Sequence, residues 1–206
     1  MKIAFIYDAV YPWLTGGVEK RVYEISRRLA TEHEVHIFGV NWWRGGRTIV
    51  KDGVYVHGVC RPMKLYVGGR RSIREPIYFA CKVLFPLLKE EFDLIDCQEF
   101  PYFQCFSAKV HSVLKNSNLI ITWHELWEDY WYEYIGKMGF FGKVVEKNVA
   151  KLANKNIAVS NETKKNLERI GLSDVVLIPN GIDFKKINKI KAHNKRYDVI
   201  FVGRFI

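Results

Sequence analysis

The stretch KIAFIYDAVYPWLTGGVEKRVYEISRRL, residues 2–29, decides the fold class. It begins with an apolar run, IAFIY, that is typical of a buried β-strand. After Gly16 and Gly17, apolar residues recur at steps of three and four, which predicts a helix: Val18, Val22, Ile25 and Leu29. The two glycines therefore lie where the carboxyl end of a strand meets the amino end of a helix.

The glycine loop has two interpretations. The free N–H groups and the dipole of a helix amino end attract anions, and glycine allows a ligand to approach the backbone closely. Alternatively, the glycines only form the turn, and Gly16 with Glu19 marks a helix start. No G-x-G-x-x-G follows the first strand and no G-x-x-x-x-G-K-[ST] occurs, which argues against a classical dinucleotide or P-loop site.

Composition places the chain among globular proteins. Its 206 residues suit one domain, or one domain plus a fragment, and its 49% apolar and 15% aromatic content argues against disorder. The start MKIAFIYDAVYP lacks a signal-peptide cleavage site, and no apolar run reaches membrane-spanning length. The cysteines show neither a C-x-x-C pair nor zinc-site spacing, which predicts reduced, buried thiols in a cytoplasmic protein without a metal: Cys60, Cys81, Cys97 and Cys105.

The net charge of +10 includes a concentrated basic segment, residues 61–74. RPMKLYVGGRRSIR carries five basic residues and no acidic one. The segment has Gly68 and Gly69 at its centre, followed by Arg70 and Arg71, and it indicates either contact with an anionic acceptor or membrane face, or an ordinary solvated loop. Nucleic acid is not an expected partner, because no helix-turn-helix, zinc-finger or RNP pattern occurs.

Apolar runs alternate with helical patterns along the whole chain. Strands are predicted at 2–7, 33–40, 53–60, 92–99 and 118–125, and within 155–163 and 174–183. Helices are predicted between them, including one near 101–116 and a long segment over 127–153. This alternation predicts an α/β fold with a doubly wound, Rossmann-like parallel sheet.

Polar and aromatic residues gather where these strands end. Ligands of doubly wound sheets bind beyond the carboxyl ends of the strands. The residues at that edge are therefore candidates for a binding site: Tyr11 to Gly17, Gln98, Glu99, His124, Glu125, Ser160, Asn180 and Gly181.

Five segments, in this order, resemble the GT4-type (group 1) retaining glycosyltransferases, which have the GT-B fold: GGVEKRVYEISRRLATEHEVHIF, WHE, NKNIAVSNETKKNL, IPNGID and FVGR. The resemblance implies two Rossmann-like domains that face each other across a cleft, the first for the acceptor and the second for a nucleotide-sugar. Residues 1–179 then correspond to the acceptor-side domain. Residues 180–206 correspond to the interdomain linker, with Asn180 and Gly181 at the hinge, and to the first strand of the second domain. The glutamate motif that grips the donor has no counterpart, so residues 1–206 alone are expected to be inactive.

The resemblance also implies roles for individual residues. His124 would lie beside the transferred sugar, while Gly16, Gly17 and Arg204 would bind the donor diphosphate. The residues expected on the acceptor side are Tyr11, Gln98, Glu99, Glu125, Arg70 and Arg71. Glu125 departs from the aspartate that is more common in the family, and cap or turn roles remain open for Gln98 and Glu99.

The implied co-substrate is a UDP-, GDP- or ADP-linked sugar, with no metal or other cofactor. The acceptor would be a glycan, a lipid or a small molecule, with peripheral contact to an anionic membrane as one option. Two alternatives remain: a nucleotide-sugar epimerase relative, which needs further acid–base residues that the sequence does not show, and a non-catalytic module that docks on membranes or partners. Trp123, Trp127 and Trp131 are interpreted as core and rim packing rather than as sugar platforms.

Overall fold

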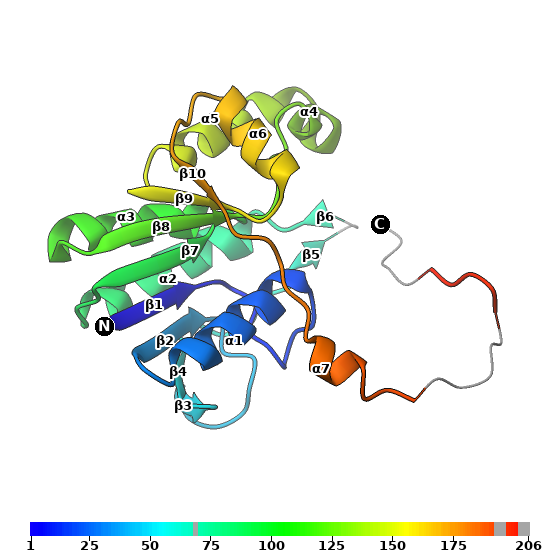
Figure 1. The fold of residues 1–206 in the computed structure, drawn as a ribbon. Helices are drawn as coiled ribbons and strands as arrows, with labels where there is room; N and C mark the ends of the chain where they lie inside the picture. Colours follow the sequence, from blue (N-terminus) through cyan, green and yellow to red (C-terminus); the bar gives the residue numbers. More distant parts are fainter. Residues whose placement is uncertain (68–69, 192–196, 202–206) are drawn as a thin grey trace.

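The computed structural model describes residues 1–67, 70–191 and 197–201, and its centre is an eight-stranded sheet (Figure 1). The strand order is β10-β9-β8-β7-β1-β2-β4-β3, and every neighbouring pair is parallel except β3–β4. The strands are β1 (Lys2–Ile6), β2 (Glu34–Gly39), β3 (Thr48–Lys51), β4 (Val54–Gly58), β7 (Leu94–Gln98), β8 (Asn118–Trp123), β9 (Lys155–Ala158) and β10 (Val175–Leu177). The predicted doubly wound α/β fold is confirmed.

The helices follow the strands in the expected alternation. They are α1 (Gly17–Leu29), α2 (Arg74–Leu88), α3 (Phe103–Lys115), α4 (Tyr130–Ile135), α5 (Gly139–Ala150), α6 (Asn161–Arg169) and α7 (Phe184–Ile187), with a 3-10 turn η1 (Gly136–Met138). A small hairpin of β5 (Tyr66–Val67) and β6 (Arg70–Arg71) precedes α2. Ser160 caps α6, since its hydroxyl accepts the Thr163 N–H at 3.0 Å.

The chain order places the reversal of the sheet between β1 and β7. From β1 the chain adds β2 and β4 on one side, and it then returns to add β7, β8, β9 and β10 on the other. In doubly wound sheets the ligand crevice lies at this reversal, outside the carboxyl ends of the strands. Those ends lead into the glycine loop after β1 and into Glu99 after β7.

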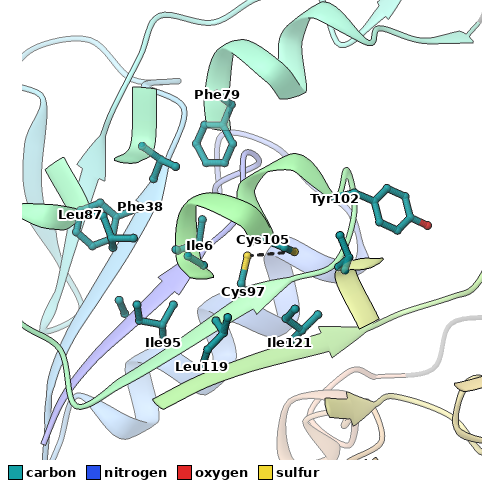
Figure 2. Close-up of a cluster of buried hydrophobic side chains, with 14 of the residues drawn as sticks. Ile6, Phe38, Phe79, Leu87, Ile95, Cys97, Tyr102, Cys105, Leu119 and Ile121 are labelled. Atoms are coloured by element: carbon teal, nitrogen blue, oxygen red, sulfur yellow. Dashed lines mark hydrogen bonds between the residues drawn. The ribbon is translucent and has the colours of Figure 1, made fainter. Parts of the chain in front are cut away.

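The alternation of side chains in β1 divides the core into two clusters. Ile3 and Phe5 pack on one face with Val22 of α1, and Ala4 and Ile6 belong to the larger cluster that α2 and α3 cover. Figure 2 shows part of this larger cluster, where the sulfur atoms of Cys97 and Cys105 lie 3.5 Å apart. All four cysteines are free; Cys60, Cys97 and Cys105 are buried, but Cys81 is exposed, so the expectation of a buried thiol is wrong there.

Two elements differ from the prediction. The sequence analysis missed β3, a short edge strand that reaches β4 through Asp52 and Gly53, both at positive φ (51° and 80°). An Asp-Gly pair with this backbone is the signature of a two-residue hairpin. The predicted long helix over 127–153 is interrupted, because Gly136 adopts a φ of 62° between α4 and the turn η1.

The carboxyl-terminal part follows β10 along the surface to α7 (Figure 1). Residues 197–201, the described part of the predicted last strand, are assigned to no strand. Arg204 and the rest of FVGR lie outside the described residues. Within the described ranges, no helix is both long enough and apolar enough to cross a membrane.

Candidate functional site

Gln98, Glu99 and His124 come together at the carboxyl edge of β7 and β8. These strands are parallel neighbours with Gln98 opposite Thr122, so the residues after each strand meet at one edge. The His124 Nε2 atom lies 2.9 Å from Gln98 Oε1. Glu99 Oε1 accepts the backbone N–H of His124 at 2.9 Å and that of Glu125 at 3.3 Å. Glu99, which directly follows β7, therefore fixes the turn that carries His124.

A hydrogen-bond chain fixes the imidazole of His124. Gln98 Nε2 donates to Asp96 Oδ1 at 3.1 Å, and the Thr122 hydroxyl donates to the same oxygen at 2.7 Å. Because the Gln98 amide nitrogen is turned toward Asp96, its oxygen faces His124, and His124 Nε2 must donate to it. The other ring nitrogen, Nδ1, then keeps its lone pair. This is the tautomer in which Nδ1 can accept a hydrogen bond from a ligand.

Burial keeps His124 neutral. It lowers the pKa of His124 to about 4, and the positive charge of Arg21 acts in the same direction. Burial raises the pKa of Asp96 to about 6, against the hydrogen bond from Thr122 and the charge of Arg21. At neutral pH the imidazole of His124 is therefore uncharged, and the Gln98 amide that orients it is itself bonded to the Asp96 carboxylate.

Glu99 is completely buried, with 0% of its surface exposed. Burial raises the pKa of Glu99 to about 8, although hydrogen bonds from backbone N–H groups, those of His124 and Glu125 first, oppose the shift. Its Oε2 atom has no hydrogen-bond partner among the described residues. Gln98 is also buried. In this conformation both side chains position His124 and its turn, and their roles as acceptor contacts remain predictions.

Arg21 of α1 joins this site to the linker, and the sequence analysis missed it. Its guanidinium donates to the Ile178 carbonyl at 3.0 Å, to the Pro179 carbonyl at 3.1 Å and to Asn180 Oδ1 at 3.0 Å. Burial lowers the pKa of Arg21, and the charge of Asp96 opposes the shift. Arg21 follows Gly17 by four residues, a spacing that puts both on one helix face.

The two glycines of the loop differ in their surroundings. Gly16 is the N-cap of α1, and a Cβ built on it would lie 2.7 Å from the Glu19 carboxylate. Gly17 is exposed, its φ is outside the left-handed region, and a Cβ there would meet no atom within 4 Å. Local packing thus explains glycine at position 16, and nothing among the described residues requires glycine at position 17.

The other predicted site residues spread along the same edge. The Tyr11 ring packs against Tyr23 with centroids 4.7 Å apart, so it lies on α1. The exposed Glu125 accepts the indole N–H of Trp127 at 2.7 Å. The backbones of Arg70 and Arg71 form β6, which pairs with β5 in a two-stranded sheet separate from the main one (Figure 1).

The linker residues only partly match the expectation. Asn180 is held by Arg21, as described above. Gly181 does not have a left-handed φ in this conformation. Its assignment to a hinge stays a prediction.

The tryptophans fall into two groups. Trp123 is completely buried and donates to Asn156 Oδ1 at 2.8 Å, which confirms its place in the core. Trp127 and Trp131 instead line an apolar cavity of about 380 Å³ next to the site. The part of the chain that the structure describes contains no group of three or more histidine, cysteine or acidic residues that could hold a metal.

Comparisons with known proteins agree with this architecture. The chain matches sucrose-phosphate synthase from Thermosynechococcus elongatus with a TM-score of 0.68 and 16% identity, over 89% of this chain and 49% of that one. It matches Anabaena HepE in complex with UDP-glucose with a TM-score of 0.58 and 16% identity, over 90% of this chain and 45% of HepE. It matches the lipopolysaccharide outer core galactosyltransferase WaaB with a TM-score of 0.53 and 16% identity, over 88% of this chain and 46% of WaaB.

The chain therefore spans about half the length of these structural neighbours, and their fold is consistent with the predicted N-terminal half of a GT-B fold. No protein of curated function matches the sequence. The family model of Glycosyltransferase Family 4 matches residues 15–186. Since this match covers most of the chain, the protein belongs to Glycosyltransferase Family 4.

Proposed function

We propose that this chain is the acceptor-side domain of a retaining glycosyltransferase that moves a sugar from a nucleotide-sugar to an acceptor hydroxyl. The observation that carries the proposal is the neutral, tautomer-fixed His124 after β8, bonded to Gln98 of β7, at the carboxyl edge where ligands of doubly wound sheets bind. Its lone pair at Nδ1 can accept a hydrogen bond from a hydroxyl of the bound sugar or acceptor. An imidazolium there would repel the positive charge that develops on the sugar during transfer.

The donor diphosphate would lie against the amino end of α1. Gly17 leaves its side-chain position open, and a helix amino end offers N–H groups and a favourable dipole to an anion. Structures of HepE in complex with UDP and with UDP-glucose support a nucleotide-sugar as donor. We propose that the remaining donor contacts come from Arg204 and from a second domain.

The reaction breaks one bond and forms one. The bond between the anomeric carbon and the diphosphate oxygen breaks, and the nucleoside diphosphate leaves with the bonding electrons. The acceptor oxygen bonds to the same face of the anomeric carbon, and its proton passes to the departing phosphate. Preorganised N–H donors at the diphosphate stabilise the charge that develops there.

The test uses the two-domain protein with UDP-, GDP- and ADP-linked sugars, and measures release of the nucleoside diphosphate. Losing a hydrogen bond between neutral groups costs roughly 0.5–1.5 kcal/mol, so we expect His124→Ala to lower kcat about 2- to 10-fold. The matched control is His33→Ala, since His33 precedes β2 at the opposite edge of the sheet. We expect residues 1–206 alone to release no nucleotide. Release by residues 1–206, or an unchanged rate in His124→Ala, would contradict the proposal.

A further inference from the structure

The apolar cavity beside the site has a lining without any charged residue. It lies between the start of α2, the turn after β7, and the α4–η1–α5 segment. The residues that line it are Ser72, Ile73, Pro76, Phe100 to Phe103, Trp127, Trp131, Tyr134, Ile135, Met138, Phe141, Gly142 and Val145. Its volume of about 380 Å³ lies within the range of small-ligand pockets.

The cavity opens into an exposed apolar rim. Ile73 is 59% exposed, Met138 is 59% exposed and Phe141 is 60% exposed, although each lines the cavity. Phe140, next to Phe141, is exposed as well. A contiguous apolar surface around a pocket is typical of a site that contacts another apolar surface.

Two exposed basic residues adjoin rim residues in the chain: Arg74 follows Ile73, and Lys137 precedes Met138. Ser72 and Ile73 directly follow β6, which belongs to the segment of residues 61–74 with five basic residues and no acidic one. The acidic Asp129 of the α4–α5 segment pairs with Lys143 at 2.6 Å, and Glu133 carries the remaining exposed negative charge of α4. A hydrocarbon-lined pocket whose rim residues adjoin Arg74 and Lys137 matches an anionic lipid.

The cavity is continuous with the candidate site. Phe100 follows Glu99 directly, and its ring stacks on Trp127 with centroids 5.4 Å apart. Trp127 in turn donates to Glu125, the residue after His124. A molecule whose hydrocarbon part fills the cavity would therefore carry its polar end out past Phe100 and Trp127, toward Glu125 and His124.

We propose that this cavity binds the hydrocarbon chain of an anionic membrane lipid, and that this lipid is the acceptor. The acceptor role rests on the proposed function; the binding of the lipid does not. Basic residues near a membrane are attracted to the negative surface of anionic lipids, which adds to the binding of the hydrocarbon chain. The cavity and the basic segment thus act together at one membrane surface.

The binding test uses the protein with vesicles of phosphatidylglycerol whose acyl chains are brominated, because bromine quenches nearby tryptophan fluorescence. We expect quenching that falls strongly when Trp127 and Trp131 are both replaced by phenylalanine, although the other tryptophans remain. We expect Phe141→Glu to weaken vesicle binding at least tenfold. Leu114→Glu is the matched control: Leu114 is exposed on α3, near the helix end that lies away from the cavity.

Three outcomes would overturn lipid binding in the cavity: vesicles that do not bind, Phe141→Glu that binds as well as the parent, or quenching that survives the loss of both tryptophans. Because exposed Phe141 makes no part of the buried core, circular dichroism should show Phe141→Glu folded. If Phe141→Glu is unfolded, Met138→Glu takes its place at the same rim with the same expected loss.

The acceptor role has its own readout in the two-domain protein. We expect label from a radioactive nucleotide-sugar to enter the organic-solvent phase in the presence of the vesicles, and Phe141→Glu to abolish this transfer. Hydrolysis of the nucleotide-sugar by water should continue in Phe141→Glu, since His124 and α1 are unchanged. Hydrolysis without any lipid product in the parent protein would overturn the lipid acceptor and leave the proposed function standing. Absence of both reactions would contradict the proposed function as well.

Discussion

Replacing Gly17 by valine adds a branched side chain at the first position of α1, where the structure leaves the space empty. The φ of Gly17 is not left-handed and no atom lies within 4 Å of the added Cβ, so the fold has no steric reason to resist the change. Valine also has a higher helix propensity than glycine, by roughly 0.3 kcal/mol. We therefore expect the free energy of unfolding to change by less than about 0.5 kcal/mol, which shifts Tm by about 1–2 °C.

The same valine should strongly lower the rate of sugar transfer. The diphosphate would have to come within hydrogen-bonding distance of the backbone at Gly17, and the side chain keeps it away. Losing one preorganised donor of this kind costs about 3–4 kcal/mol in other enzymes, which corresponds to roughly 10²- to 10³-fold in kcat. Gly17→Ala, with one methyl group, should give a smaller loss with the same stability.

The assay compares kcat of the two-domain protein with thermal unfolding of each variant. Nucleotide binding to the open form should change less than kcat, because the second domain would supply most of that contact. A normal rate in Gly17→Val would mean that the loop is only a turn. An unfolded Gly17→Val protein would mean that glycine is needed for packing, and the anion-site interpretation would lose its support in either case.

Three further predictions concern the surroundings of His124 and the basic segment. In the folded state the pKa of Glu99 is about 8, above its ordinary value near 4.5, so the folded protein binds a proton that the unfolded chain has lost between these pH values. The free energy of unfolding should therefore fall as pH rises from about 5 to 8, by up to ~1.4 kcal/mol per pH unit. Urea unfolding curves of Glu99→Gln should lack this part of the pH dependence, and an unchanged pH dependence would refute the shift. Arg21→Gln should raise the pKa of His124, measured by NMR, because it removes a nearby positive charge. It should also speed proteolysis after residue 177, and an unchanged cleavage rate would refute the idea that Arg21 holds the linker. Exchanging Arg70 and Arg71 for serine should weaken binding to anionic vesicles and flatten its dependence on salt, whereas unchanged binding would favour an ordinary solvated loop.

The strands were predictable because burial on both faces demands continuous apolar runs, as in LIITW of β8. The edge strand β3 was harder, since only one of its sides is paired and TIVK is short, although the Asp52–Gly53 turn signal was present. The place of His124 followed from the end of its strand. The tautomer of His124 could not be predicted from the sequence, because it depends on the Gln98 and Asp96 side chains of a neighbouring strand.

Arg21 shows what local patterns leave out. Its partners lie 157 to 159 residues further along the chain, and no periodicity of α1 indicates them. The same guanidinium binds the linker, is attracted by Asp96 and lowers the pKa of His124. Any movement of residues 178–180 must therefore carry the guanidinium along or break its three hydrogen bonds. A displaced guanidinium changes the electrostatic potential at His124, so a movement of the linker that carries Arg21 along also changes the pKa of His124.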